Sequence, residues 1–525
     1  LGGTTVIGAH AFENAACYSS VTLTIPETLV SIGDYAFSGA CLVEVIFPET
    51  SALRTIGGYA FSDVGLSGTL TIPASVTEIY AYAFGGNDFS EVEFRDGNDA
   101  LAIGLPITVK GFAGPEDIYG YVFYDNTSLT SIALPARLTK IYADTFRDLR
   151  NLETVTFGSD ENPSKLTTIG EYAFSRTGLT SVTIPASVKN TDTEIAIGAN
   201  AFEFAELASL TFEPGGSATT APLTIGANAF SGLSATEVVL PARLAYFTDV
   251  NGNVTAPFAN GRDTFSASVR SFVISGDEDS VSAYTSLGGV IYNSDMTELI
   301  FCPAGMTGTV TVPKSVKKIA DYAFNECNEL TGIEFEEDSV LEEVGYLAFR
   351  LCVSLGSIAL PDSVHTIGEG AFMRCDSLTS FTIPASLKDF NQSIIESCGA
   401  LASLEVSAQN TNYKSIDGVL FSADGKTLLL YLSTRPGTSY AVPAGTEIIY
   451  ARAFSQNKFL TSVTIPASVK LIDSGAFQSC TSLSSVTLED GKEPLVIGDY
   501  AFNDTALTGV VIPARVRSVN LYAFA

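Results

Sequence analysis

The hydrophobic and polar positions of this chain repeat as one unit, and residues 357–378 are a clear copy of it. Each unit opens with a short stretch in which apolar residues alternate with small polar ones, and the stretch ends in an apolar-proline pair such as Ile383-Pro384. A period of two predicts a β-strand with one buried face, and proline removes a backbone donor where the strand ends. Strands that recur once per unit must run parallel.

A return segment follows each strand and carries a valine, an Ile-Gly pair and an Ala-Phe pair, as in Val364, Ile367-Gly368 and Ala371-Phe372. We predict that valine, isoleucine and phenylalanine point into the core, and that glycine allows a tight turn that a Cβ would obstruct. The space before the next leucine is too short for a packed helix of ordinary length. We therefore expect a single helical or 3₁₀ turn there.

The Ala-Phe pair recurs from one end of the chain to the other, most often in steps of 23, 25 or 28 residues. Its phenylalanines are Phe12, Phe37, Phe61, Phe84, Phe123, Phe146, Phe174, Phe202, Phe230, Phe324, Phe349, Phe372, Phe454, Phe477, Phe502 and Phe524. Self-similarity at this period predicts one continuous solenoid over residues 1–525, with about 18 coils, a parallel β-sheet and little regular helix.

Departures from the unit are of two kinds. We expect a long edge loop at about residues 95–117, because polar, glycine and proline residues lengthen the unit there. Two larger segments, at about 275–311 and 407–442, align with each other. In the second, Asp424-Gly425 separates two apolar strands, which is a strong hairpin signal. We interpret both as hairpin insertions and neither as a domain boundary, and we expect the solenoid to be truncated at both ends.

The charge of the chain and the length of its apolar runs argue against nucleic-acid binding and against a membrane-spanning helix. The formal net charge is -30 and the pI is near 4.3, whereas nucleic-acid binders need a basic surface. No apolar run approaches the roughly 18 residues of a membrane helix. An acidic surface fits solubility outside the cell.

The strand ending in Ile-Pro, followed at fixed offsets by Ser-Val, Ile-Gly, Ala-Phe and Cys, resembles the BspA-like, or Treponema pallidum-type, leucine-rich repeat family. The resemblance covers nearly the whole chain. It implies a leucine-rich repeat solenoid that forms a curved right-handed superhelix. It also implies a secreted or surface protein of host-associated bacteria or some protists, with adhesion to matrix proteins, host cells or other microbes as the associated function.

Five of the eight cysteines lie three residues after the repeat phenylalanine, or after Ile395 in its place. They are Cys327, Cys352, Cys375, Cys398 and Cys480. A fixed place in the repeat predicts a ladder of buried free thiols. The alternative is one or two disulfides between neighbouring coils, whose spacing of about 4.8 Å is within reach of a bridge. Cys17, Cys41 and Cys302 lie off this ladder.

Tyrosines also follow the repeat, two residues before the phenylalanine, and Tyr35, Tyr59 and Tyr82 are three of them. Such a stripe either binds sugars or protein side chains, or forms a half-buried ladder that supports the turn. The hairpins supply the other candidate interaction residues. These are Tyr292, Asn293 and Asp295 in the first, and Asp424 and Lys426 in the second.

Catalysis and metal binding have little support. The two histidines, His10 and His365, occupy variable positions of the repeat, and no carboxylate pair converges at an identifiable place. Residues 249–253 are faintly similar to a calcium loop, but Val254 stands where that loop needs glycine. We predict no catalytic, metal or cofactor site.

The leading hypothesis is a non-enzymatic scaffold, extracellular or on a cell surface, that binds a protein or glycan through its edge loops and hairpins. A glycan-acting solenoid enzyme and a passive stalk are the alternatives.

Overall fold

The computed structural model describes residues 3–15, 21–111, 114–216, 219–248, 264–275 and 282–525. They form two compact units, residues 1–294 and 295–525. The boundary between the units falls inside the first predicted insertion. Each unit is a parallel β-solenoid, with about 21 turns in the described residues of the two together.

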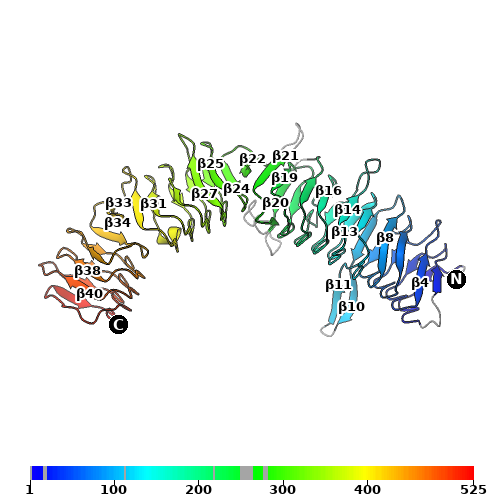
Figure 1. The fold of residues 1–525 in the computed structure, drawn as a ribbon, viewed down its shortest axis with the longest axis horizontal. Coiled ribbons are helices and arrows are strands. Elements are labelled where there is room, and N and C mark those ends of the chain that lie inside the picture. The colour runs from blue at the N-terminus through cyan, green and yellow to red at the C-terminus, as the bar shows by residue number, and fades with distance from the viewer. Residues whose placement is uncertain (1–2, 16–20, 112–113, 217–218, 249–263, 276–281) are drawn as a thin grey trace. The chain divides into compact units, whose positions relative to one another are not determined.

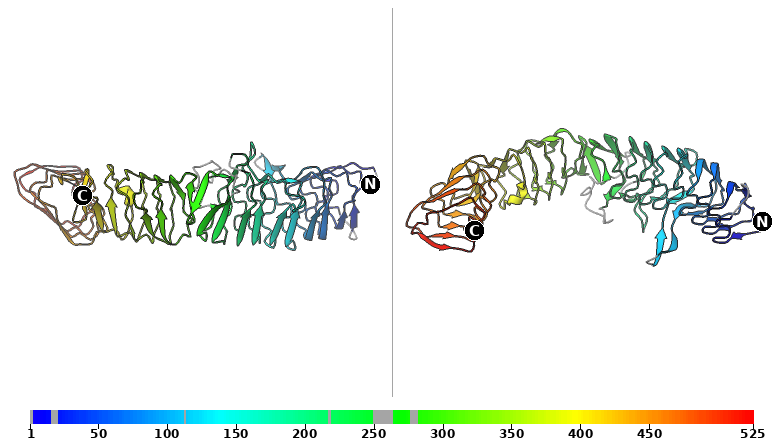
Figure 2. Two further views of the ribbon diagram at one scale, coloured as in Figure 1. Left: turned by 90° about the horizontal axis from the view of Figure 1, so that it is seen from above. Right: turned by 60° about the horizontal axis from the view of Figure 1, so that its bottom comes forward.

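Most coils have two strands, and Figure 2 shows the strands of successive coils side by side. The strand before the proline alternates exposed and buried residues, as Ser181–Ile184 does, so its apolar side faces the core. In unit 1 these strands are β2 (Val21–Thr24), β4 (Leu42–Ile46), β6 (Ser67–Ile72), β8 (Asp88–Phe94), β12 (Ser131–Leu134), β14 (Thr154–Phe157), β16 (Ser181–Ile184), β17 (Ser209–Phe212), β19 (Glu237–Pro241) and β21 (Ser271–Ser275). In unit 2 they are β25 (Gly308–Val312), β27 (Leu330–Phe335), β29 (Ser357–Ile358), β31 (Ser380–Ile383), β32 (Ser403–Val406), β36 (Ser439–Ala441), β38 (Ser462–Ile465) and β40 (Ser485–Leu488). They pair in twos and threes.

The return strands are shorter and form longer parallel sheets, such as β1-β3-β5-β7-β9-β13-β15. In unit 1 they are β1 (Val6–Ile7), β3 (Ser31–Ile32), β5 (Thr55–Ile56), β7 (Glu78–Tyr80), β9 (Leu101–Leu105), β13 (Leu138–Ile141), β15 (Thr168–Ile169), β18 (Leu223–Ile225) and β20 (Leu244–Phe247). In unit 2 they are β24 (Glu298–Phe301), β26 (Lys318–Ile319), β28 (Glu343–Val344), β30 (Thr366–Ile367), β35 (Thr427–Leu430), β37 (Ile448–Ile449), β39 (Leu471–Ile472), β41 (Leu495–Ile497) and β42 (Val516–Val519).

The repeat phenylalanines stack inside the coils, as predicted. Phe349 and Phe372 lie 5.0 Å apart between ring centroids with an interplanar angle of 5°, and both are fully buried. Coils without an Ala-Phe pair keep the stack with another residue. Phe265 stacks on Phe230, and Tyr431 stacks on Phe454. Phe265 and Tyr431 therefore mark coils that the Ala-Phe pairs alone do not reveal.

The turn around the phenylalanine is not helical, so our prediction of a helical or 3₁₀ turn in each coil was wrong. Its residues form consecutive β-turns: Ala36 donates to Gly33 and Ser38 to Tyr35. Tyr35 has a φ of 57° and Gly39 a φ of 65°, and left-handed residues break a helix. Within the described residues, η1 (Gln392–Ile395) is the single 3₁₀ helix.

The glycine of the Ile-Gly pair is explained by close approach of coils. A Cβ on Gly57 would lie 2.6 Å from the backbone nitrogen of Asp34 in the preceding coil. Gly8 occupies the same place in the first described coil, and a Cβ there would meet nothing within 4 Å. The demand for glycine thus comes from stacking of one coil on another.

We predicted a long edge loop at about residues 95–117, and the structure has strands in this segment. The segment contains the return strand β9 and an antiparallel hairpin, β10 (Ile107–Gly111) and β11 (Gly114–Ile118). Figure 1 shows this hairpin projecting from the coils of unit 1. The alternation of Ile107, Thr108 and Val109 carries the strand signal that the glycines and prolines around it obscured.

The predicted hairpin at Asp424-Gly425 is confirmed, since β34 (Val419–Ser422) and β35 are antiparallel. A further strand, β33 (Tyr413–Ile416), pairs antiparallel with β34. In unit 1, β22 (Tyr284–Leu287) and β23 (Val290–Asn293) form the matching pair.

Three buried arginines bridge coils in a way that the repeat did not predict. Arg137, Arg243 and Arg515 each follow a Pro-Ala pair. The guanidinium of Arg243 donates to the carbonyls of Val188 and Pro185, the latter at 3.0 Å. Both acceptors belong to a Pro-Ala-Ser-Val turn two coils earlier, and the intervening coil has a glycine-rich loop in place of that turn. The arginine thus fills the position that the missing turn leaves empty.

Candidate interaction surfaces

The candidate tyrosines of unit 1 form a stacked row along the outer turn. Successive centroids are 4.7 Å apart from Tyr35 to Tyr59 and 4.6 Å apart from Tyr59 to Tyr82. His10 extends the row at one end, 5.0 Å from Tyr35, and Tyr121 extends it at the other, 5.2 Å from Tyr82. The structure therefore brings the three predicted residues together.

Stacking limits what this row offers to a partner. Because each ring covers the face of the next, ring edges and phenol hydroxyls are presented instead of flat faces. Burial raises the pKa of Tyr59 to about 12, so its phenol is protonated at physiological pH. A left-handed backbone costs a bulky residue about 1–2 kcal/mol, and the stacking contacts offset that cost at Tyr35, Tyr59 and Tyr82.

An arginine continues the row where the tyrosine is missing. Asp144 has the tyrosine position in its coil, and Arg147 pairs with it at 2.8 Å. The guanidinium carbon of Arg147 lies 4.5 Å from the centroid of Tyr172 and 5.9 Å from that of Tyr121. A cation between two rings preserves the attraction that ring stacking supplies elsewhere.

Beyond Arg147, two arginines, Glu206 and an exposed phenylalanine line a cavity of about 510 Å³. Phe204 is 55% exposed and has a φ of 56°, and the guanidinium of Arg176 lies 5.7 Å from its ring. Within the described part of the chain, neither Arg150 nor Arg176 forms an ion pair. We call Arg150, Arg176 and Phe204 the arginine-aromatic edge. The sequence analysis missed it, although arginine is scarce in this acidic chain and two of them fall near Phe204.

The hairpin candidates are largely engaged in their own turns. Asp424 accepts hydrogen bonds from the Ser422 hydroxyl at 2.7 Å and the Lys426 amide at 2.9 Å, and these bonds lower its pKa. Lys426 pairs with Glu447 at 2.8 Å. Both tip side chains are exposed, but they also stabilise the hairpin.

The first hairpin requires a correction. Tyr292 is 1% exposed, because it occupies a core position equivalent to Phe421 in the second hairpin. Its ring is therefore not presented to a partner. Asn293 is half-buried at the end of β23, and Asp295, which is exposed, accepts a hydrogen bond from Thr297 at 2.7 Å.

The model of the BspA-type leucine-rich repeat region matches residues 5–102, 116–250, 298–424 and 437–525 in six copies. The chain belongs to this family. No protein with a curated description matches it.

Solved structures of leucine-rich repeat proteins are similar to the chain at low identity. The pneumococcal vaccine antigen PcpA is 18% identical with a TM-score of 0.40, and the similarity covers 93% of each chain. A leucine-rich repeat protein from Bacteroides ovatus is 21% identical with a TM-score of 0.41, over 77% of this chain and 87% of that one. A leucine-rich cell surface protein from Faecalibacterium prausnitzii is 20% identical with a TM-score of 0.32, over 75% and 89%.

The cysteines of this leucine-rich repeat chain form the predicted ladder. All five are buried free thiols, and Cys352 donates to the carbonyl of Phe324 in the preceding coil at 3.1 Å. Cys375 and Cys398 make the equivalent bond one and two coils further on. Cys302 lies off the ladder, as predicted, and takes the position of the repeat phenylalanine: its N–H donates to Ala323. Cys17 lies outside the described residues.

The other candidate sites receive no support from the geometry. Residues 249–253 lie outside the described part of the chain, and no group of three or more potential ligands for a metal is found within it. His10 belongs to the tyrosine row, and His365 is an exposed residue that contacts Thr366 and Glu342. Of the residues described, no helix is long and apolar enough to cross a membrane.

Proposed function

We propose that this chain is a non-enzymatic adhesion scaffold, secreted or displayed on a cell surface, that binds an extracellular protein through the arginine-aromatic edge. The observation that carries the proposal is a pair of arginines that form no ion pair with any described residue, beside an exposed phenylalanine, in a chain with a net charge of -30. Arginine and aromatic residues are enriched among the residues that dominate binding energy in protein interfaces.

The charge pattern favours a partner with acidic groups at the contact. Arg150 and Arg176 are free to form bidentate bonds with carboxylates, which Arg147, engaged with Asp144, is not. The net charge of -30 disfavours approach of the same partner elsewhere on the chain. Membership of the BspA-type leucine-rich repeat family supports a position outside the cell.

The test is binding of the full chain to immobilised matrix proteins and to host cells. We expect the double variant Arg150→Ala/Arg176→Ala to bind at least tenfold more weakly, and Phe204→Ala to weaken binding to a similar degree. Arg54→Ala is the matched control, because Arg54 is a half-exposed arginine of the same unit that already pairs with Asp99.

A second arm tests the hairpins, whose tips differ from the regular coils. Replacing residues 424–426 by a glycine-containing turn removes the exposed Asp424 and Lys426. If only this change abolishes binding, the contact lies at the hairpins and not at the edge. If the chain degrades a polysaccharide and a carboxylate substitution abolishes that activity, the enzyme alternative is correct. If the chain binds none of the proteins and cells tested, the passive-stalk alternative is favoured.

A further inference from the structure

Unit 2 contains a place where the bonding between successive coils is interrupted. In the regular turns, the left-handed residue after the phenylalanine donates its N–H to the next coil, as Arg374 does to Glu396 at 2.9 Å. Ser397 is the equivalent residue one coil on, with a φ of 60°. Among the described residues, the N–H of Ser397 has no acceptor in the next coil.

The interruption follows from the hairpin insertion. The coil after η1 uses its residues for β33, β34 and β35, and resumes the ladder only at Tyr431, whose N–H donates to Ala453 at 2.8 Å. Its turn is therefore shortened, and Thr434 bridges back to the carbonyl of Leu401. A pocket of about 380 Å³ opens between η1 and the turn that carries Phe454.

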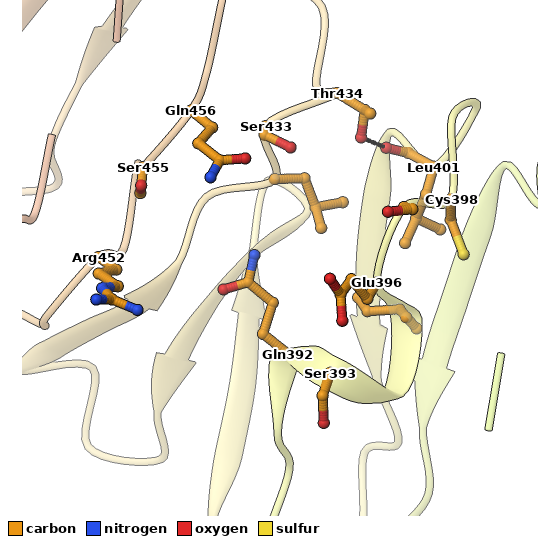
Figure 3. A pocket seen from close by; sticks show the side chains of 13 residues that line it. Gln392, Ser393, Glu396, Cys398, Leu401, Ser433, Thr434, Arg452, Ser455 and Gln456 are labelled. Carbon is orange, nitrogen blue, oxygen red and sulfur yellow. Dashed lines mark hydrogen bonds between the residues drawn. The ribbon is translucent and has the colours of Figure 1, made fainter. Parts of the chain in front are cut away.

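Hydrogen-bonding side chains surround this pocket. Figure 3 shows Gln392 and Gln456 extending toward its centre from opposite sides, with Glu396 beside them and Arg452 at one edge. None of these four side chains forms a hydrogen bond or ion pair with another described residue. Buried Ile395, Leu401 and Leu432, together with Cys398, form an apolar floor. Ser397, Ser433 and Ser455 complete the polar rim.

From this arrangement we infer that the pocket binds a single neutral sugar residue, such as the end of a glycan. Two amides, one carboxylate and one guanidinium offer donors and acceptors together, which matches hydroxyl groups that both donate and accept. The opposite charges of Glu396 and Arg452 cancel, so the pocket does not favour an anion or a cation. The apolar floor suits the C–H face of a sugar ring, and the volume lies within the range of about 300–1,000 Å³ for small-molecule pockets.

The test uses the full chain and ligand-observed saturation-transfer NMR, followed by calorimetric titration. The probes are glucose, galactose, mannose and N-acetylglucosamine, with free glutamine and glutamate as zwitterions of similar size. We expect at least one sugar to bind, and the double variant Gln392→Ala/Gln456→Ala to weaken that binding at least tenfold. Since both glutamines are exposed and make no bonds within the protein, the variant should unfold at the same denaturant concentration as the wild type.

Gln478→Ala is the matched control, because Gln478 lies one coil beyond Gln456, accepts its N–H at 2.9 Å through the backbone, and does not line the pocket. The inference is wrong if no sugar binds, if only the amino acids bind, or if the double variant binds a sugar as the wild type does. The pocket is in unit 2 and the arginine-aromatic edge in unit 1, so each proposal fails or stands without the other.

Discussion

Replacing Arg243 by methionine is expected to destabilise the coils around it by about 2–4 kcal/mol. Arg243 is fully buried, and its two hydrogen bonds reach carbonyls of the Pro-Ala-Ser-Val turn two coils earlier. Hydrogen bonds to a charged group contribute about 1.5–3 kcal/mol each. The net loss in the variant is smaller than the sum of the two bonds, because methionine avoids the desolvation penalty of a buried cation. Burial acts strongly here: it lowers the pKa of Arg243 to about 10.

The loss is not shared equally by the two acceptors. Pro185 keeps the bond that its carbonyl accepts from the N–H of Val188. The carbonyl of Val188 is left without a donor in the variant, and an unsatisfied buried carbonyl costs about 1–3 kcal/mol. Methionine fills the space of the arginine stem, so the effect reports hydrogen bonding and not a cavity.

Denaturant unfolding gives the magnitude, and hydrogen exchange gives its location. Exchange should quicken at the amides of Val188 and Leu223, since Leu223 donates to the carbonyl of residue 243. Arg54→Met, at a half-exposed arginine, should change the free energy of unfolding by less than about 0.5 kcal/mol. A loss below about 1 kcal/mol at Arg243, with unchanged exchange at Val188, would refute the bridging role.

Three further outcomes are expected. Phe372→Ala should lower the free energy of unfolding by about 3–5 kcal/mol, because the ring is fully buried. Phe459→Ala, at a ring that is 51% exposed, should lower it much less. Hydrogen exchange that shows no local loosening around residues 364–378 would contradict the reasoning. Gly57→Ala should cost about 1–3 kcal/mol through contact with the preceding coil, and Gly8→Ala should be nearly neutral in the same assay. The pKa of Tyr59 is about 12 in the fold and 10.0 is the ordinary value, so the unfolded state loses this proton first as the pH rises. The free energy of unfolding should therefore fall between pH 10.0 and about pH 12. In a pH titration followed by phenolate absorbance, Tyr59→Phe should lack one late-titrating group that the wild type has.

The sequence predicted the residues that occupy the same position in many coils, and it missed the residues that replace an absent part of a coil. Phe372, Val364 and Cys375 are buried because every coil places the same residue type at the same point, which a single chain displays many times over. The Arg243 bridge forms because the intervening coil lacks the Pro-Ala-Ser-Val turn. The hydrogen-bond partners of Arg243 are therefore 55 and 58 residues away, and this separation is not a period of the repeat. The Pro-Ala-Arg triplet was the available signal.

The candidate surfaces were harder to predict for a related reason. Tyr35, Tyr59 and Tyr82 were found because they follow the repeat. Phe204 and Arg176 also occupy one position of the repeat, the left-handed residue two places after the phenylalanine, but the residue type at that position varies from coil to coil, so the repeat does not single them out. Tyr292 was misjudged because a hairpin in this fold joins the sheet and buries one face, instead of standing free in solvent.

The bonds from coil to coil also determine how each unit responds to mechanical load. Backbone N–H groups of one coil donate to carbonyls of the next, as from Phe349 to Ala371 and from Phe372 to Ile394. These bonds lie along the stacking direction, so tension in that direction loads them in series and only one interface has to open at a time. A leucine-rich repeat unit anchored at a surface and held by a partner would then lengthen by releasing single coils, and it would absorb a pull without losing the remaining coils.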